Sequence, residues 1–207
     1  MVKRIMIPLL VTTLMLMAIS PAWGALNTFS INIVSGDAEL DRSSEDLSQL
    51  TFGLTVPLNN KVEFNGELST GEIGDEDSTA FKLKADYRIY QDRKVRLDLA
   101  GGYYQRTEDY WGDYKISTFF VGIDGRIRLD NRLSLYTGLG IGLMPEEKQY
   151  GFDGDPESLY LFHLKLNYLL NSKFGLSVGY FSESFESDLY SGDTTYKGVT
   201  AGAFFRF

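Results

Sequence analysis

The sequence contains no cysteine, a single histidine and only 5 prolines in 207 residues. The lack of cysteine excludes a disulfide framework and a cysteine-ligated zinc site. Basic residues are also in deficit, because 20 Lys and Arg face 28 Asp and Glu, for a formal net charge of −8. With no basic stripe to displace counterions from phosphates, nucleic acid is excluded as an expected partner. What the sequence does have is 21 Gly, 14 Phe and 13 Tyr, in a chain long enough for one domain.

The N-terminal segment "MVKRIMIPLLVTTLMLMAISPAWGALN" has the features of an export signal. A short basic start precedes an apolar stretch, and the small residues Ala22 and Gly24 occupy the −3 and −1 positions of a cleavage site. We therefore predict a signal peptide at residues 1–24 and a mature domain at residues 25–207, exported from the cytoplasm. The alternative is an uncleaved anchor, which needs about 20 apolar residues. No later segment resembles a transmembrane helix.

After the predicted signal peptide, polar and apolar residues alternate along nearly the whole sequence. In the stretch "TAFKLKADYRIY", Phe81, Leu83 and Tyr87 fall on one face, whereas Lys84 and Asp86 fall on the other. A period of two predicts β-strands with two different faces, and no helical period of comparable length is present. The predicted fold class is therefore all-β. Alternation alone does not distinguish a soluble sandwich from a membrane barrel.

The connections between the predicted strands fall into two kinds. Four are tight, and each carries Asn or Asp together with Lys or Arg: "LNNK" at 58–61, "QDRK" at 91–94, "DNR" at 130–132 and "NSK" at 171–173. The other five are expected to be longer and acidic, among them "GDAELDRSSED" and "GEIGDEDS". Short turns at one end and long loops at the other are typical of outer-membrane barrels.

The apolar face is graded along each predicted strand. Aromatic residues lie near both ends, such as Tyr103 and Phe119 toward the long loops and Tyr168 and Phe174 toward the tight turns. Aliphatic residues lie between them. Two aromatic girdles around an aliphatic band are what a bilayer favours, because amphipathic rings prefer the headgroup level. We therefore predict a transmembrane antiparallel up-and-down β-barrel rather than a soluble sandwich.

Ten strands are expected, with eight as the alternative if the weakly patterned first pair is not formed. The expected strands are residues 26–36, 47–58, 61–71, 80–90, 94–106, 115–129, 132–144, 158–170, 173–185 and 195–207. An even number of strands places both termini of the mature chain on the side of the tight turns, which is the arrangement of bacterial outer-membrane barrels.

The closing segment "YKGVTAGAFFRF" alternates as far as Phe207, with Phe205 two residues earlier. With this motif, and over the whole mature chain, the sequence resembles bacterial outer-membrane β-barrel proteins of the small β-barrel domain type. The resemblance implies a monomer in the outer-membrane lipid bilayer, whose C-terminal Phe205 and Phe207 are the signal for the barrel-assembly machinery. The last strand is expected to pair with the first, because an unpaired edge in lipid leaves backbone groups unsatisfied.

The polar face of the strands points into the barrel under this interpretation. The predicted lumen-lining charges are Glu63, Glu67, Lys82, Lys84, Asp86, Arg88, Arg96, Asp98, Arg106, Asp124, Arg126, Arg128, His163, Lys165 and Arg206. Buried charges persist when they are paired, which favours a filled, salt-bridged interior and a structural or surface-interaction role. The alternative is a narrow, porin-like passive channel for small, preferentially anionic solutes.

The single histidine is not expected to make the protein an enzyme. His163 is followed two residues later by Lys165, where lipid A deacylases of the outer membrane carry a serine. Omptin-type proteases also have ten strands, but they are longer and need pairs of aspartates beside a histidine. We therefore assign no catalytic residue, no metal ligand and no cofactor.

The acidic connections are the remaining functional candidate. Asp75 and Asp77, and likewise Asp153, Asp155 and Glu157, alternate in the manner of Ca²⁺-ligating carboxylates, but neither stretch completes an EF-hand loop. We expect solvated acidic loops at the cell surface, where divalent cations could bridge them to lipopolysaccharide.

Overall fold

The computed structural model describes residues 26–40, 43–109, 114–149, 152–154, 156, 158–187 and 192–207. The strands are β1 (Thr28–Leu40), β2 (Ser43–Pro57), β3 (Val62–Ile73), β4 (Glu76–Gln91), β5 (Val95–Glu108), β6 (Tyr114–Arg128), β7 (Leu133–Gln149), β8 (Phe152–Gly154), β9 (Leu159–Leu169), β10 (Phe174–Ser187) and β11 (Gly192–Arg206). Within these ranges no helix is long and apolar enough to cross a membrane. The predicted signal peptide at 1–24 lies outside the described residues.

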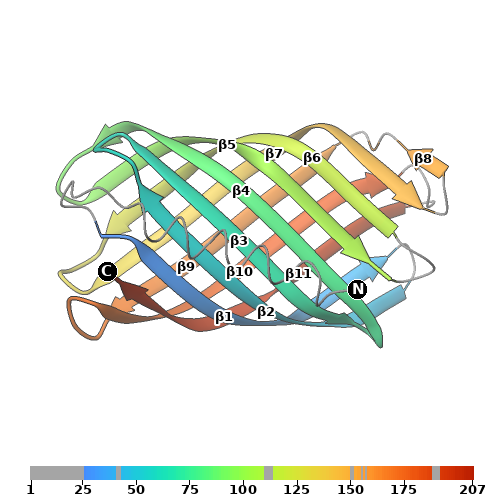
Figure 1. Ribbon diagram of the computed structural model, residues 1–207, viewed down its shortest axis with the longest axis horizontal. Helices are drawn as coiled ribbons and strands as arrows, with labels where there is room; N and C mark the ends of the chain where they lie inside the picture. The colour runs from blue at the N-terminus through green and yellow to red at the C-terminus, as the bar shows by residue number, and fades with distance from the viewer. Residues whose placement is uncertain are drawn as a thin grey trace.

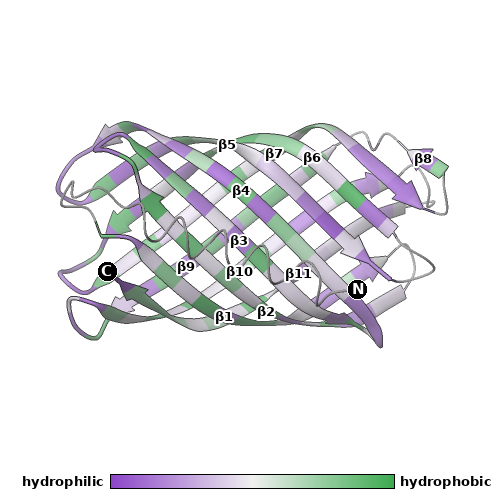
Figure 2. Ribbon diagram, in the orientation of Figure 1, coloured by the Kyte–Doolittle hydropathy of each residue, from purple (hydrophilic) through white to green (hydrophobic). Residues whose placement is uncertain are grey.

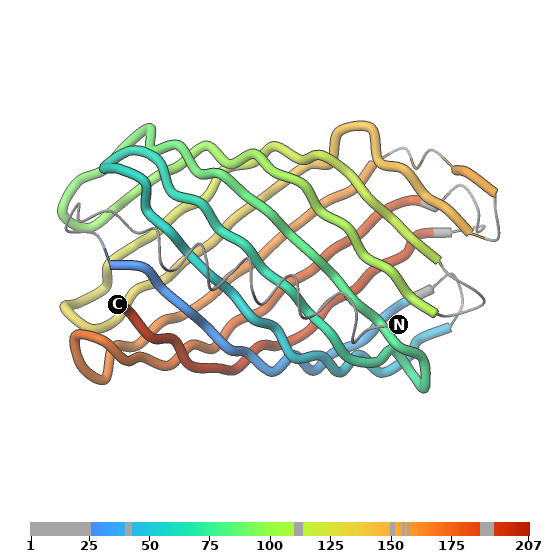
Figure 3. Tube along the Cα trace, viewed as in Figure 1, coloured from blue at the N-terminus to red at the C-terminus, as the bar shows by residue number. Residues whose placement is uncertain are grey.

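Ten of the eleven strands form a closed antiparallel barrel, and the short β8 pairs only with the end of β7. Each barrel strand pairs with its neighbours in sequence, β7 pairs with β9, and β1 pairs with both β2 and β11. The strands run obliquely around the barrel (Figure 1), and the C-terminal strand returns beside the N-terminal one (Figure 3). The predicted ten-strand barrel is confirmed, and the eight-strand alternative is wrong because β1 and β2 are paired over their length.

The seam that closes the barrel is continuous. Its register runs from Thr28 opposite Arg206 at one end to Leu40 opposite Thr194 at the other. Just beyond it, the backbone N–H of Asn27 donates to the carbonyl of Phe207 over 2.8 Å, and the N–H of Phe207 donates back over 3.0 Å. Pairing of this kind leaves no open strand edge along the seam, as a bilayer requires.

The four predicted tight turns share one local structure and lie at the same end of the barrel, here called the turn end. A side-chain oxygen accepts hydrogen bonds from the backbone N–H groups two and three residues later: Asn59 from Lys61 and Val62, Asp92 from Lys94 and Val95, Asp130 from Arg132 and Leu133, and Asn171 from Lys173 and Phe174. Asn and Asp recur in these turns because their side chains replace a missing backbone partner.

The opposite end, here called the loop end, differs from the prediction of long loops. β3 and β4 are joined only by Gly74 and Asp75, and Gly74 has a φ of 58°, which glycine adopts without strain. β1 continues to Leu40 and β2 begins at Ser43. The prediction of long loops is wrong at both connections. These strand ends have the composition of loops because their outward residues are polar. The outward face of a membrane barrel needs apolar residues only where it contacts lipid.

The outward face carries an apolar belt around the barrel. Its exposed aliphatic residues include Ile31, Ile33, Leu50, Leu83, Leu97, Leu99, Val121, Ile123, Leu139, Ile141, Leu176, Val178 and Val199. Beyond this belt, toward the loop end, outward positions become polar, as at Asp37 and Glu72; Figure 2 shows the strand ends beside β8 as mostly hydrophilic. Nine of the ten barrel strands have 12 to 17 residues and β9 has 11, whereas a membrane crossing takes about 9–11. The nine longer strands are therefore long enough to project beyond a bilayer.

Candidate functional site: the barrel interior

The interior of the loop half contains one apolar cluster, beside buried polar side chains that include Glu108 and Glu147. Its buried members are Val34, Ala38, Leu47, Ile73, Ala80, Tyr104, Tyr114, Ile116, Phe120, Leu159, Leu161, Phe185 and Tyr196. Nine of the ten barrel strands contribute to this cluster. The tenth, β7, contributes Gly140 and Gly142, where an added Cβ would lie 3.4 Å from Phe120 and 2.9 Å from Leu159, respectively. The apolar cluster therefore reaches across the whole section of the barrel.

One ion pair is embedded in this apolar cluster. Arg106 is 1% exposed, and its Nη2 donates to Oε2 of Glu183 over 2.7 Å. The Tyr104 hydroxyl donates to the same carboxylate over 2.6 Å and accepts from Arg106 Nε over 2.9 Å. The Arg106 guanidinium also lies 4.1 Å from the ring centre of Tyr196. These contacts replace the water that a buried guanidinium loses, and so offset the cost of burying its charge.

Glu183 was absent from the predicted lumen-lining charges. It lies near the end of the expected strand 173–185, two residues after Phe181. The alternation of Val178 and Tyr180 on the outward face continues along β10 and places Phe181, Glu183 and Phe185 inward. The period of two within the expected strand 173–185 was therefore the signal that could have found it.

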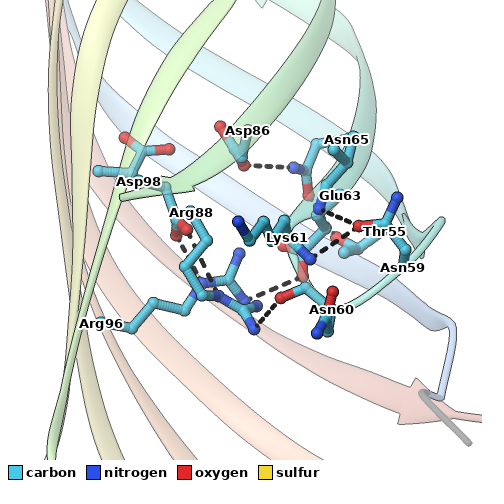
Figure 4. A network of polar contacts seen from close by, with 12 residues as sticks. Thr55, Asn59, Asn60, Lys61, Glu63, Asn65, Asp86, Arg88, Arg96 and Asp98 are labelled. Atoms are coloured by element: carbon cyan, nitrogen blue, oxygen red, sulfur yellow. Dashed lines mark hydrogen bonds and ion pairs between the residues drawn. The ribbon is translucent and has the colours of Figure 1, made fainter. Parts of the chain in front are cut away.

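The turn half of the interior contains a network of matched charges on β3, β4 and β5 (Figure 4). Arg96 lies 3.1 Å from Glu63 and 2.6 Å from Asp98, and Arg88 lies 3.8 Å from the second oxygen of Asp98. The guanidinium of Arg88 also donates to the carbonyl of Asn60 in the first tight turn over 2.6 Å. Each of these two arginines thus has a carboxylate beside it.

Between the two halves lies a second charged group. Lys84 bridges Asp124 and Asp86, the latter at 3.2 Å, and His163 Nε2 lies 3.9 Å from the other oxygen of Asp124. Gly138 makes room for this contact, because a Cβ added there would clash with the side chains of both Asp124 and His163. Three more of the predicted lumen-lining charges are Glu67, Lys82 and Lys165. Glu67 lies within electrostatic range of both lysines.

Three further arginines of the turn half, on β6 and β11, differ from Arg88 and Arg96. Arg126, Arg128 and Arg206 take part in none of the ion pairs among the described residues. The guanidinium of Arg126 lies 5.0 Å from the ring centre of Tyr136, and that of Arg206 lies 5.3 Å from the ring centre of Phe204. We call these three residues the arginine triad.

Little empty space separates the apolar cluster from the charged groups. A cavity of about 10 Å³ lies among Lys84, Asp124, His163, Phe120 and Leu161. That is room for about one water molecule. In the described part of the chain, no group of three or more His, Cys, Asp or Glu residues is arranged to hold a metal ion. Of the predicted acidic candidates, Asp155 and Glu157 lie outside the described residues.

Comparisons with known proteins define the class of fold. No family model and no curated protein matches the chain. The outer membrane protease OmpT from Escherichia coli superimposes with a TM-score of 0.60 at 10% identity, over 90% of this chain and 98% of that one. The COG4313 outer membrane channel from Pseudomonas putida gives 0.52 at 12%, over 88% and 96%. The β domain of the Bordetella autotransporter BrkA gives 0.52 at 10%, over 88% and 100%. At such identities the similarity shows the fold alone, that of outer-membrane β-barrels.

Proposed function

We propose that the protein is a monomeric β-barrel of the bacterial outer membrane, with a filled interior and a structural or surface-interaction role. The observation that carries this proposal is the apolar cluster inside the loop half, to which nine of the ten barrel strands contribute. A conducting pore needs a continuous polar path, and buried apolar side chains across the section oppose one. Small barrels have interiors that side chains can fill.

The two rims of the barrel support a role at the surface. The loop end exposes many carboxylates on its strand ends and its turn: Asp37, Glu39, Asp46, Glu72, Asp75, Glu76, Asp77, Glu146, Glu186 and Asp193. The turn end exposes Lys61, Arg93, Lys94, Arg132 and Lys173. We place the turn end in the periplasm and the acidic end outside, as in bacterial outer-membrane barrels. The proposal includes divalent cations that bridge the acidic rim to lipopolysaccharide. Calorimetry of the refolded protein with millimolar Ca²⁺ tests this part, and the absence of heat would contradict it.

Single-channel recording in planar bilayers tests the filled interior. The wild-type protein is expected to give no steady conductance. A variant that removes large buried side chains from the apolar cluster, Leu47→Ala with Ile116→Ala and Tyr196→Ala, is expected to conduct. The matched control carries Leu99→Ala, Ile123→Ala and Tyr87→Ala, which remove similar volumes from the outward face, and it should stay silent.

A passive channel is the second candidate, and the unpaired arginine triad is the observation that favours it. Steady wild-type conductance, with an anion preference that decreases in Arg126→Ala or Arg128→Ala, would replace the structural proposal by this one. The channel candidate fails if wild-type bilayers are silent while the cluster variant conducts, because the apolar cluster then closes the barrel.

A further inference from the structure

The positive charge in the turn half is distributed unevenly around the barrel wall. On β3, β4 and β5, Arg88 and Arg96 each lie within 4 Å of a carboxylate. On β6 and β11, the arginine triad contributes three positive charges and forms no ion pair with the described residues. Three arginines of this opening, on β6 and on β11 beyond β7, β9 and β10, therefore lack the carboxylate neighbour that Arg88 and Arg96 have.

The three side chains of the triad enter the same opening from strands that are not neighbours, because β7, β9 and β10 lie between β6 and β11. Arg206 lies within electrostatic range of both Arg126 and Arg128, and of the phenol of Tyr136. Arg126 and Arg206 are half-buried, whereas Arg128 is exposed. The backbone N–H groups of Arg128 and Arg206 each donate to a carbonyl of a tight turn, at Lys94 and Lys173. Like charges held together in this way repel one another, and an anion between them removes that repulsion.

Aromatic rings hold two of the guanidinium groups. Tyr136 lies under Arg126 and Phe204 under Arg206, at 5.0 and 5.3 Å from ring centre to guanidinium carbon. A ring contact of this type occupies the face of the guanidinium and leaves its in-plane N–H groups able to donate. Held guanidinium groups lose less freedom when they bind, and their N–H forks match the oxygens of a phosphate.

From this arrangement we propose that the arginine triad is a binding site for a phosphate group, open to the turn end of the barrel. Three guanidinium groups supply both the charge and the number of donors that suit a tetrahedral, doubly charged oxyanion better than a carboxylate with two oxygens. The apolar cluster separates the triad from the loop end. With the orientation proposed above, the ligand reaches the triad from the periplasm, as a soluble phosphate compound or as a phospholipid headgroup.

Calorimetry with inorganic phosphate tests the site on the refolded barrel in a neutral detergent at low ionic strength. The double variant Arg126→Gln/Arg206→Gln is expected to weaken phosphate binding by about tenfold or more, since each removes charge-assisted hydrogen bonds. The control Arg93→Gln/Arg132→Gln removes the same charge from the exposed tight turns and should bind as the wild type does. Equal weakening in both variants would show general attraction to a basic rim and overturn the site.

Protection from arginine modification tests the same site in the wild-type protein, independently of how the variants fold. Phosphate is expected to slow the reaction of phenylglyoxal with Arg126 and Arg206, as mapped by mass spectrometry, and to leave Arg132 unaffected. Repeating the reaction in phosphatidylcholine vesicles with and without phosphatidylglycerol distinguishes the two sources. Protection by phosphatidylglycerol alone assigns the triad to a lipid headgroup, and protection by neither overturns the proposal. Bilayer conductance plays no part in either readout, so this proposal and the filled interior fail separately.

Discussion

Arg106 Nη2 lies 2.7 Å from Glu183 Oε2 although 77 residues separate the two in sequence. Arg106 is on β5 and Glu183 is on β10, and these strands are not neighbours in the barrel. Their contact therefore bridges the interior and ties opposite walls together. It does so beside an apolar cluster, where the side chains of Arg106 and Glu183 are only 2% and 15% exposed and neither charge keeps its full hydration.

Breaking this pair is expected to destabilise the barrel strongly. Arg106→Met leaves the Glu183 carboxylate without its cation, at a cost of about 3–5 kcal/mol in the free energy of unfolding. Unfolding in urea from lipid vesicles measures the change. The double variant Arg106→Met/Glu183→Met should recover much of the loss, because it leaves no unpaired charge.

The exposed pair of Lys197 and Glu39 is the control, since its atoms are 2.5 Å apart but both side chains are at least 35% exposed. Glu39→Gln should cost less than about 1 kcal/mol, as expected for a surface ion pair. Equal costs at the two pairs would show that burial does not determine the contribution of the Arg106–Glu183 contact.

The architecture could be predicted because each constraint on it is local in sequence. A period of two defines the strands, as in "TAFKLKADYRIY", and the Asn or Asp of each tight turn accepts hydrogen bonds from residues only two and three positions away. The solved barrels confirm the class of fold at identities near 10%. Closure of the barrel could be predicted because an open strand edge in lipid would leave backbone N–H and C=O groups without hydrogen-bond partners.

The interior could be predicted only in part because its contacts are not local. Alternation gives the face on which Arg106 lies, but its partner Glu183 depends on which strands stand opposite one another across the barrel. The apolar cluster was missed for a related reason. Leu47 and Ile73 are buried inside strand segments whose outward residues are polar, and these segments have the composition of loops.

A charge on the lipid-facing belt is expected to be costly at mid-belt and mild at its edge. Leu99→Arg places a guanidinium at a 48% exposed aliphatic position and should cost about 2–4 kcal/mol. The control Thr107→Arg lies on the same strand and face but near the loop end, and should cost about 0–1 kcal/mol. Unfolding in lipid vesicles measures both. Equal, small costs would mean that the belt does not face hydrocarbon.

Two of the tight turns are expected to make stability depend on pH. Hydrogen bonds from the N–H groups of Val95 and Lys94 lower the pKa of Asp92 below its ordinary value of 3.8, and Asp130 behaves in the same way in its own turn. A lowered folded-state pKa gives stability that is present above the unfolded pKa and lost as the pH falls through the folded one. Replacing both aspartates by Asn, which fills the same place at Asn59, should reduce the loss of stability below about pH 4. A pH series of urea midpoints for wild type and variant measures this, and identical curves would contradict it.

The aromatic end of the closing strand is expected to matter for assembly in cells more than for folding itself. The rings of Phe205 and Phe207 stack with centres 5.8 Å apart, and Phe174 packs on Phe205 at 4.8 Å. If Phe207 is part of an assembly signal, Phe207→Ser should lower the amount of folded barrel in the outer membrane several-fold while signal-peptide processing continues. Phe174→Ser is the control, because it removes a ring from the same girdle on a different strand and should have a smaller effect. Refolding into pure lipid vesicles should then be similar for both variants, since no assembly machinery acts there. A Phe207→Ser variant that reaches the membrane at wild-type levels would show that the residue contributes only packing.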